Sequence, residues 1–296
     1  MRRRAPLALR QEEMIEQNES EESLRPALYV VATPLGNLGD LSPRAFHVLS
    51  AADVVLAEDT RRSGQLFHRL GIPAHGFVSF HEHNEDARTA HVIETLQEGK
   101  SVALISDAGT PLMSDPGFTL VRECRREGLD VVPVPGASAP LTALSASGIP
   151  PLPFTFLGFL PRKVSEQKRL FATHGATGAT LVFFERKNRL MESLALAHEC
   201  LGARDVCVCR ELTKAHEDFI NGNLAELDSL EVPLLGEFTI VVGPPSKNER
   251  ATQDEVCALL EREREAGGKP RQLARRVADQ VQGWSSKDVY ALLNSL

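Results

Sequence analysis

Acidic, imidazole and hydroxyl side chains gather in three short stretches of the sequence. AEDTR (57–61) and HEHNE (81–85) offer carboxylates, imidazoles and an arginine, and SDAGTPLMSDPG (106–117) carries two Ser-Asp pairs around a tight turn. Carboxylates and imidazoles can take up a proton from a reacting group, and at suitable spacing they can also hold a metal ion. The three stretches are therefore the first candidates for a functional site.

A metal site is the weaker of these two possibilities. His81 and His83, with Glu82 and Glu85 beside them, have the ligand types that transition metals prefer. Two ligands so close together at the end of a strand are common in proteins without a metal. We therefore expect no metal in this protein.

The two Ser-Asp pairs have different predicted roles. Asp115 stands before Pro116, a pair typical of a helix start, so we expect Asp115 to cap the next helix. Asp107 follows the strand-like run 102–106 and has no evident structural need to be acidic. Ligands bind at the carboxyl ends of parallel strands, which favours a ligand contact for Asp107. The alternative, that both aspartates only shape the turn, stays open.

The elements that must position these residues alternate between strand and helix. Alternation of this kind implies a parallel sheet covered by helices. Gly99 and Gly128 stand where two of the helices should end. The predicted strands are 28–32, 54–58, 77–80, 102–106 and 130–134, and the predicted helices are 42–52, 60–71, 84–99 and 115–128.

The domain organisation follows from changes in composition along the chain. Three prolines in 149–153 indicate a linker, and the polar opening segment favours a disordered tail. We predict a disordered tail at 1–26, an N-terminal α/β domain at 27–148, a linker at 149–153, a C-terminal mixed α/β domain at 154–243 and a helical tail at 251–296. In the second domain we expect strands at 154–160, 180–185, 206–211 and 237–243 and a helix at 188–202, and in the tail two or three short helices.

Two further loops should open on the same edge as the acidic turn. They are ATPLGNLGDL (32–41) and VPGASAPLTALSASG (134–148), the second of which starts a helix of small residues. Neither loop has the G-x-G-x-x-G order of a dinucleotide site or the pattern of a P-loop. The residues by themselves therefore indicate a ligand-binding α/β enzyme and no particular cofactor.

Composition excludes several classes of protein. The 296 residues carry a net charge of −7, which argues against binding nucleic acid by bulk charge. The five cysteines are scattered, so a disulfide framework is not expected; Cys207 and Cys209 should share one buried face of a strand. No apolar run approaches the ~20 residues that span a bilayer, and the basic opening lacks a signal sequence, so we expect a cytoplasmic protein without membrane contact.

Eight motifs in one order add a family resemblance over about residues 27–243. They are TPLGNLGDLSPRA, LAEDTR, HEHNE, SDAGTPLMSDPG, VPGASAPLTALSASG, FLGFLPRK, RELTKAHE and GEFTIVVG. Together they resemble the bacterial 16S rRNA (cytidine-2′-O)-methyltransferases of the tetrapyrrole-methylase superfamily. The resemblance implies a two-domain tetrapyrrole-methylase-like fold, S-adenosylmethionine bound in a cleft between the domains, the 16S rRNA or the small ribosomal subunit as partner, and a homodimer.

The same resemblance implies which residues contact the cofactor. Most of them lie in the loops that follow the first, fourth and fifth strands, and two come from the second domain. They are Thr33, Pro34, Asp107, Ala108, Gly109, Thr110, Gly136, Ala137, Ser138, Phe184 and Leu212.

Catalysis on a ribose needs a group that removes the proton of the 2′-hydroxyl. In-line geometry supplies most of the acceleration, and a base or a cation near the oxygen should help. The candidates are Glu58, Asp59, Arg61 and His83. The alternative for each is a solvated loop charge, and Asn84 beside them is expected to cap a helix.

RNA contacts should come from local basic clusters, since the chain as a whole is acidic. The tail segment KPRQLARR (269–276) carries four cations and no acid and could hold phosphates. Residues 186–188 depart from the Ser-Pro-His-like stretch of relatives, so no family role is carried over to them. The predicted RNA-binding residues are Arg61, Arg62, Arg162, Lys163, Arg189, Lys269, Arg271, Arg275 and Arg276.

Two other functions remain open at this point. One is a methyltransferase of the same fold that acts on a small tetrapyrrole, which would give no reason for AEDTR, HEHNE and the basic tail. The other is a ribosome-associated RNA-binding protein that has kept the fold and lost catalysis, and such a protein would not bind the cofactor.

Overall fold

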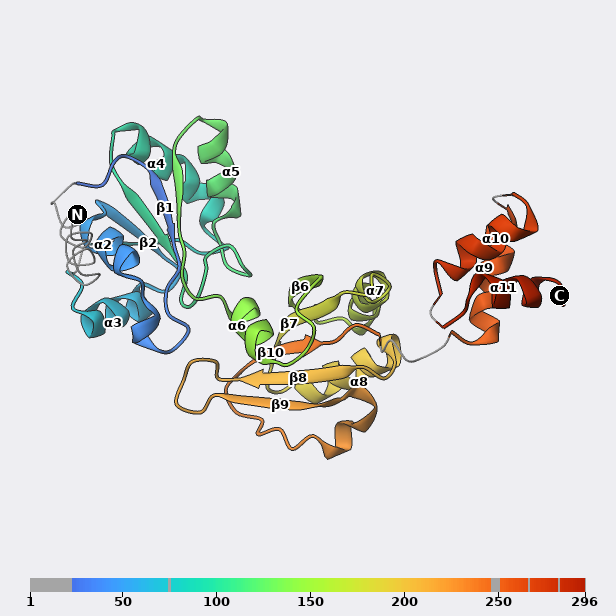
Figure 1. Cartoon of the computed structure of the whole chain (residues 1–296). Coiled ribbons are helices and arrows are strands. Elements are labelled where there is room, and N and C mark those ends of the chain that lie inside the picture. The colour runs from blue at the N-terminus through green and yellow to red at the C-terminus, as the bar shows by residue number, and fades with distance from the viewer. Residues whose placement is uncertain (1–22, 74–75, 246–250, 266, 282, 296) are drawn as a thin grey trace, which may run out of the picture. The chain divides into compact units, whose positions relative to one another are not determined.

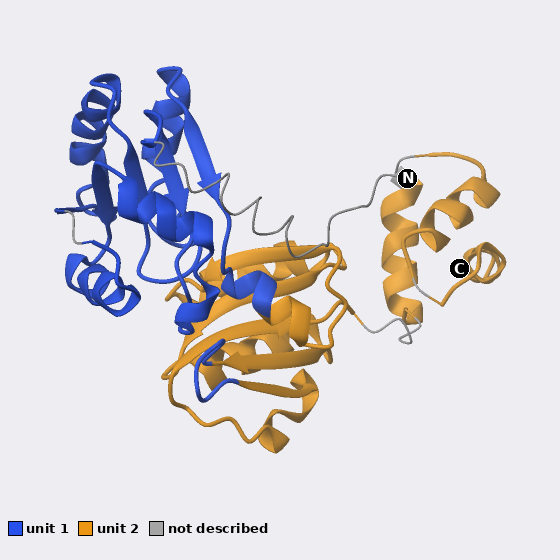
Figure 2. Ribbon diagram, turned by 60° about the vertical axis from the view of Figure 1, so that its left-hand side comes forward, with its two compact units in different colours: residues 1–142, 211–217 blue, residues 143–210, 218–296 orange. Residues whose placement is uncertain are grey.

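Contacts within the chain divide it into two units (Figure 2). Residues 1–142 and 211–217 form one unit, and residues 143–210 and 218–296 form the other. The computed structural model describes residues 23–73, 76–245, 251–265, 267–281 and 283–295. The predicted disordered tail falls mostly outside the described residues, and the predicted domain boundaries remain predictions.

The first unit contains a five-stranded parallel sheet with the strand order β3-β2-β4-β1-β5 (Figure 1). Short apolar runs form all five strands, as predicted. The central strands β1, β2 and β4 are buried on both faces and need apolar side chains throughout, whereas the edge strands β3 and β5 are only partly buried. The strands are β1 (Leu28–Val31), β2 (Val54–Ala57), β3 (Phe77–Ser79), β4 (Val102–Ile105) and β5 (Val131–Val134).

Helices cover both faces of this sheet. Side chains alternate between faces along each strand, so Tyr29 packs with α2 and α3, whereas Leu28 packs with α4 and α5. Each predicted helix is present. Their bounds are α2 (Pro43–Ala51), α3 (Thr60–Leu70), α4 (Glu85–Gln97), α5 (Phe118–Arg126) and α6 (Ala139–Ala146), with a short 3-10 helix η1 (Leu38–Asp40) before them.

The predicted cap of α2 is correct, and the predicted cap of α5 is wrong. Ser42 caps α2, because its side-chain oxygen accepts the N–H of Ala45. Asp115 does not cap α5, which starts three residues later than expected, after Gly117. Glu85 of α4 supplies that cap across space: its Oε1 accepts the N–H groups of Gly117 (3.1 Å), Thr119 (2.9 Å) and Leu120 (3.4 Å).

The second unit contains a mixed sheet with the order β6-β7-β10-β8-β9. Strands β6 and β7 are parallel and the other pairs are antiparallel. The prediction missed β9 and α7. The elements are β6 (Phe154–Phe159), α7 (Val164–Gly175), β7 (Thr180–Arg186), α8 (Leu190–Leu201), β8 (Asp205–Arg210), β9 (Asp218–Asn223), the 3-10 helix η2 (Leu224–Ser229) and β10 (Glu237–Val242).

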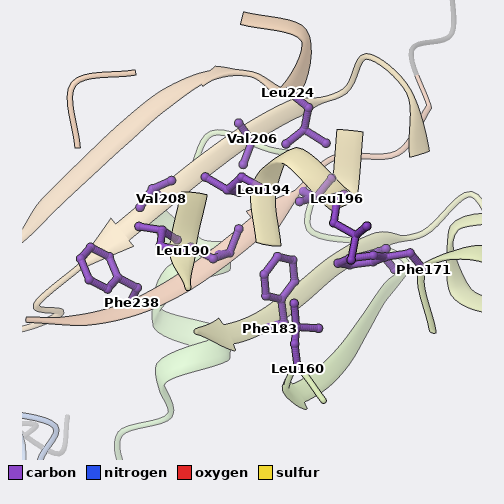
Figure 3. Close-up of a cluster of buried hydrophobic side chains, with 14 of the residues drawn as sticks. Leu160, Phe171, Phe183, Leu190, Leu194, Leu196, Val206, Val208, Leu224 and Phe238 are labelled. Atoms are coloured by element: carbon purple, nitrogen blue, oxygen red, sulfur yellow. The ribbon is translucent and has the colours of Figure 1, made fainter. Parts of the chain in front are cut away.

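The core of the second unit lies between its sheet and the helices α7 and α8. Figure 3 shows Phe171 of α7 and Leu190 of α8 among strand residues such as Phe183 and Val208. Cys207 and Cys209 are fully buried, with their sulfur atoms 3.6 Å apart, which confirms that they share one strand face.

The tail forms three helices, α9 (Gln253–Glu265), α10 (Pro270–Ala278) and α11 (Ser286–Leu293). They enclose an apolar cluster of their own that includes Val256, Leu273 and Val289. Across the described ranges of the whole chain, no helix is long and apolar enough to cross a membrane.

Candidate functional site

The first unit has a topological switch point between β1 and β4. These strands are neighbours in the sheet, yet the helix after β1 packs on one face and the helix after β4 packs on the opposite face. The loops that leave the two strands therefore diverge, and in open parallel sheets the crevice between such loops is where ligands bind. The loops are residues 32–42 and 106–117.

Backbone hydrogen bonds pin these two loops together. Thr33 donates its N–H to the carbonyl of Gly109 (2.8 Å), and Gly109 donates its N–H back to Thr33 (3.0 Å). The Thr33 hydroxyl also reaches the carbonyl of Ser106 at 3.2 Å. Gly109 has a φ of 82°, and a Cβ there would lie 3.1 Å from a methyl of Leu35, so only glycine fits this junction without strain.

The loop after β5 joins the same site. The hydroxyl of Thr110 donates to the carbonyl of Ala137 at 3.0 Å. A Cβ on Gly136 would come within 2.9 Å of the Ala32 Cβ, so the absence of a side chain permits this close approach. The structure thus brings together the three loops that hold the predicted cofactor residues of the first unit, namely Thr33, Pro34, Asp107, Ala108, Gly109, Thr110, Gly136, Ala137 and Ser138.

Asp107 has a structural reason to be acidic, which corrects the sequence interpretation. Its Oδ1 accepts the N–H of Asp59 at 3.2 Å, and its Oδ2 accepts from the Arg62 guanidinium at 2.8 Å. The carboxylate therefore ties the loop after β4 to the start of α3. Arg62, predicted to contact RNA, is held in this ion pair, although its side chain remains 70% exposed.

Asp115 and Glu58 form the acidic centre of the site. Burial and the nearby Glu58 charge raise the pKa of Asp115 to about 7, against an opposing hydrogen bond from Ser106. Burial, followed by the charge of Asp107, also raises the pKa of Glu58. Carboxyl groups in this condition favour either a bound proton or a cation placed among them. Asp115, expected to be a helix cap, thus belongs to the site.

Asp59 and Arg61 are placed differently from Glu58. The Asp59 Oδ1 accepts the N–H groups of Arg61 (2.9 Å) and Arg62 (3.3 Å) at the start of α3. The hydrogen bond from Arg61 lowers the pKa of Asp59, which makes this carboxylate a weaker proton acceptor than Glu58. The Arg61 side chain is 89% exposed.

The HEHNE segment is built around its asparagine. The Asn84 Oδ1 accepts the N–H of His81 at 2.8 Å and its Nδ2 donates to the carbonyl of Ser79 at 3.1 Å. Asn84 precedes α4 as expected, but its side chain makes no capping bond. His83 is exposed, while the Nδ1 of His81 is buried without a hydrogen-bond partner. Among the described residues, no group of three or more His, Cys, Asp or Glu side chains is arranged to hold a metal ion.

The two remaining cofactor candidates come from other segments of the chain. Phe184 stands on β7 of the second unit, where its ring packs edge-on against Phe156 (5.0 Å) and Phe159 (5.2 Å). Leu212 is buried in segment 211–217, which groups with the first unit by its contacts. In that segment the Thr213 hydroxyl accepts the N–H of Asn37 at 3.2 Å. No local pattern in the sequence pointed to this bond across 176 residues.

Some of the predicted RNA-binding side chains have hydrogen-bond or ion-pair partners within the described chain, and others have none. Arg189 donates to the carbonyl of Pro161, and Arg276 bonds Glu263 and the carbonyl of Gly267, so both support the fold. Lys163 pairs with Glu166 at an exposed position. The side chains that remain exposed without a partner in the described chain are those of Arg162, Lys269, Arg271 and Arg275.

Comparison with known proteins decides the family. The sequence model described as "Tetrapyrrole (Corrin/Porphyrin) Methylases" matches residues 27–228, which include all the site loops. The chain belongs to the tetrapyrrole methylase family. S-adenosylmethionine is the methyl donor of this family, so the cofactor expected from the resemblance is confirmed.

Relatives of this tetrapyrrole methylase cover most of its length. The protein named Ribosomal RNA small subunit methyltransferase I of Mesorhizobium japonicum is 45% identical over 266 residues, which is 88% of this chain and 90% of the relative. The protein of the same name from Bacillus subtilis is 44% identical over 77% of this chain and 78% of the relative.

Solved structures confirm the tetrapyrrole methylase fold. Diphthine synthase superposes with a TM-score of 0.60 at 16% identity, covering 73% of this chain and 90% of that one. The cobalt precorrin-4 methyltransferase superposes with a TM-score of 0.54 at 20% identity, covering 74% and 95%. At such identities the likeness concerns the fold alone.

Proposed function

We propose that this tetrapyrrole methylase transfers a methyl group from S-adenosylmethionine to the ribose 2′-oxygen of a cytidine in 16S rRNA. The relatives at 40–46% identity are named as methyltransferases of the small-subunit ribosomal RNA, which supports rRNA methylation by this chain. The cytidine and the 2′-oxygen rest on the motif resemblance. The protein would act in the cytoplasm on the small ribosomal subunit, as a homodimer.

The observation that carries the proposal is the set of three pinned loops around carboxyl groups with raised pKa values. Glu58 and Asp115 supply negative charge beside the carboxylate of Asp107, and the glycines at 109 and 136 let the three loops pack closely together. S-adenosylmethionine is a sulfonium nucleoside, so it carries a positive charge and presents many hydrogen-bonding groups. The carboxyl groups and the loop backbone therefore suit this ligand. Phe184 and Leu212 are proposed to contact its adenosine.

The chain's own residues would then act on the ribose. Bound S-adenosylmethionine supplies an electrophilic methyl group. The ribose oxygen forms the new O–C bond as the C–S bond breaks, and the hydroxyl proton leaves to a base. We assign Glu58 as that base because burial raises its pKa and makes it a stronger proton acceptor than an ordinary carboxylate, while exposed Arg61 and His83 contact the RNA backbone.

The test uses purified small ribosomal subunits from cells that lack this protein. The full chain and isotopically labelled S-adenosylmethionine are added, and the rRNA is digested and analysed by mass spectrometry. We expect labelled 2′-O-methylcytidine. A label on a base, or on another ribose, would correct the specificity, and no label in the rRNA would overturn the proposal.

Two further arms test the alternatives. Labelling of uroporphyrinogen in place of rRNA would favour a tetrapyrrole substrate. Absence of S-adenosylmethionine binding in calorimetry at high ligand concentration, with rRNA binding retained, would favour a non-catalytic RNA-binding protein. Sedimentation of the purified chain tests the proposed homodimer.

A further inference from the structure

The second unit contains a pocket of its own, with a volume of about 630 Å³. It lies where the end of β6, the start of α7 and the turn from β7 to α8 meet. This volume is within the range of small-molecule pockets in proteins. Leu160 and Leu196, labelled in Figure 3, line the pocket and also belong to the hydrophobic core, so its floor is part of the folded unit.

The polar groups of the floor are fixed and electrically balanced. The Glu185 side chain is only 1% exposed, and its Oε2 accepts from the Ser193 hydroxyl at 2.6 Å and lies 3.3 Å from the Arg189 guanidinium. Arg189 and Gln167 both donate to the carbonyl of Pro161 at 2.7 Å. Because these groups satisfy one another, the floor needs no ligand to neutralise it.

The rim, in contrast, carries two arginines whose guanidinium groups are unpaired among the described residues. Arg162 and Arg186 line the pocket and are exposed, and their guanidinium groups have no hydrogen-bond or ion-pair partner in the described part of the chain. A guanidinium presents donors in a planar fork that matches a phosphate group. Glu192 is the opposing charge on this rim, so the unpaired charge there is positive by one.

An exposed aromatic ring completes the rim. Phe159 is 53% exposed, and its ring is steadied from one side by an edge-on contact with Phe184, 5.2 Å away. The exposed part of this phenylalanine is in contact with water, and a flat ring of a ligand can cover it. Unpaired nucleobases stack on such rings, and the stacking does not depend on the base.

We propose that this pocket binds one unpaired nucleotide of the RNA substrate, beyond the nucleotide that is methylated. The base stacks on Phe159, and Arg162 and Arg186 hold the adjoining phosphates. The inference rests on the proposed function, because RNA as the source of the nucleotide follows from it. It also gives Arg186, which lies in the stretch 186–188 that departs from the family pattern, a specific part in RNA binding.

Fluorescence anisotropy tests the pocket with a defined probe. The full chain is titrated with a fluorescein-labelled cytidine hexamer at several salt concentrations. The double variant R162A/R186A should bind it at least 10-fold more weakly, and the slope of log K against log salt should fall by roughly 1.4, since each single-strand phosphate contact contributes about 0.7. Phe159→Leu should weaken binding about 5-fold or more through lost stacking.

A matched control and a variant of opposite sign sharpen the test. Arg169→Ala removes an exposed arginine of α7, the helix that follows Arg162, at a position outside the pocket, and it should leave affinity within 2-fold of the original chain. Glu192→Gln removes the opposing charge and should strengthen binding. Equal losses in R169A and R162A/R186A, or no loss in the double variant, would overturn the proposal.

Two further measurements complete the test. The first distinguishes a free nucleotide from RNA as the occupant, and the second distinguishes failure of the pocket inference from failure of the proposed function. If cytidine 5′-monophosphate binds as tightly as the hexamer and is lost in the same variants, the occupant is a free nucleotide and the RNA assignment is wrong. If the original chain methylates small subunits while R162A/R186A shows an unchanged KM for them, the pocket inference fails and the proposed function stands. An unchanged midpoint of urea unfolding in each variant shows that it is folded.

Discussion

At the scale of single residues, the site depends on which carboxyl groups are satisfied. Asp107 and Asp59 accept hydrogen bonds from backbone and arginine, whereas Glu58 and Asp115 are both partly buried, and burial and the charge of Glu58 raise the pKa of Asp115. Asp107 and Asp59 stabilise the loops. Glu58 and Asp115 instead favour binding of a proton or a cation. Carboxyl groups of the same chemical type thus take different roles in this site because their surroundings differ.

Asp115→Asn should change how stability depends on pH. The folded-state pKa of about 7 lies above the unfolded value of 3.8, so the folded chain holds this proton more tightly. The associated stability is present below about pH 4 and is lost as pH rises through 7. The full shift corresponds to about 4 kcal/mol, and solvent screening of the partly exposed carboxyl group reduces it, so at pH 8 the variant should be more stable by roughly 2 kcal/mol and at pH 4 nearly unchanged.

Urea unfolding at pH 4, 6 and 8 measures this effect. Asp228→Asn, at an exposed position of η2, is the matched control and should leave the pH dependence as it was. Equal stability of D115N and the original chain at pH 8 would contradict the raised pKa.

Cofactor affinity should rise with pH in the same range. S-adenosylmethionine carries a sulfonium charge that ionised Glu58 and Asp115 attract, whereas its demethylated product has a neutral sulfur. Calorimetry between pH 6 and pH 8 should therefore show several-fold tighter binding of S-adenosylmethionine with rising pH and a weaker trend for the product. Parallel trends for the two ligands would place the sulfur away from these carboxyl groups.

At the scale of elements, one helix start is secured from a distance. Glu85 stands in the first turn of α4 and accepts three N–H groups at the start of α5. This contact joins the HEHNE segment to the end of the SDAGTPLMSDPG loop, so part of the HEHNE pattern serves the fold of the site and not its chemistry.

Glu85→Ala should destabilise the protein by about 1–2 kcal/mol, because it leaves partly buried N–H groups without an acceptor. Glu82→Ala, three residues earlier and exposed, is the control and should cost almost nothing. The measurement is urea unfolding at pH 7. If E85A were as stable as the original chain, water would replace the Glu85 carboxylate without cost.

Sequence patterns predicted most elements but not the partners of the site residues. Runs such as VALI (102–105) are apolar throughout, which identified the buried strands. Strand β9 (DFINGN) was missed because it is polar and pairs only with β8, so it looks like a loop. The helix α7, whose N-cap residue Lys163 makes no side-chain capping bond, was missed as well. The interchange of roles between Asp107 and Asp115 depends on groups about 50 residues away, which no local pattern contains.

At the scale of the whole molecule, the tail is a small folded part with its own core. Its three helices enclose Val256, Leu260 and Val289, and Arg276 of α10 bonds Glu263 of α9. Lys269, Arg271 and Arg275 remain exposed on it. We therefore assign phosphate contacts to these three cations and an internal role to Arg276.

A chain ending at residue 245 should keep the affinity for S-adenosylmethionine within about 2-fold and lose part of its affinity for small subunits. The variant K269A/R271A/R275A should reproduce the loss with a smaller salt slope. Calorimetry and subunit binding at two salt concentrations measure the two effects. Unchanged subunit binding without the tail would show that the tail holds no phosphates.

The outermost strand of the second sheet has a consequence for how copies of the chain can associate. An open sheet margin can recruit a strand from a neighbouring molecule unless its residues discourage this. Strand β9 carries Asp218, Asn221 and Asn223, and the chain turns directly from it into η2. Continuous sheets running from one molecule into the next through β9 are therefore disfavoured.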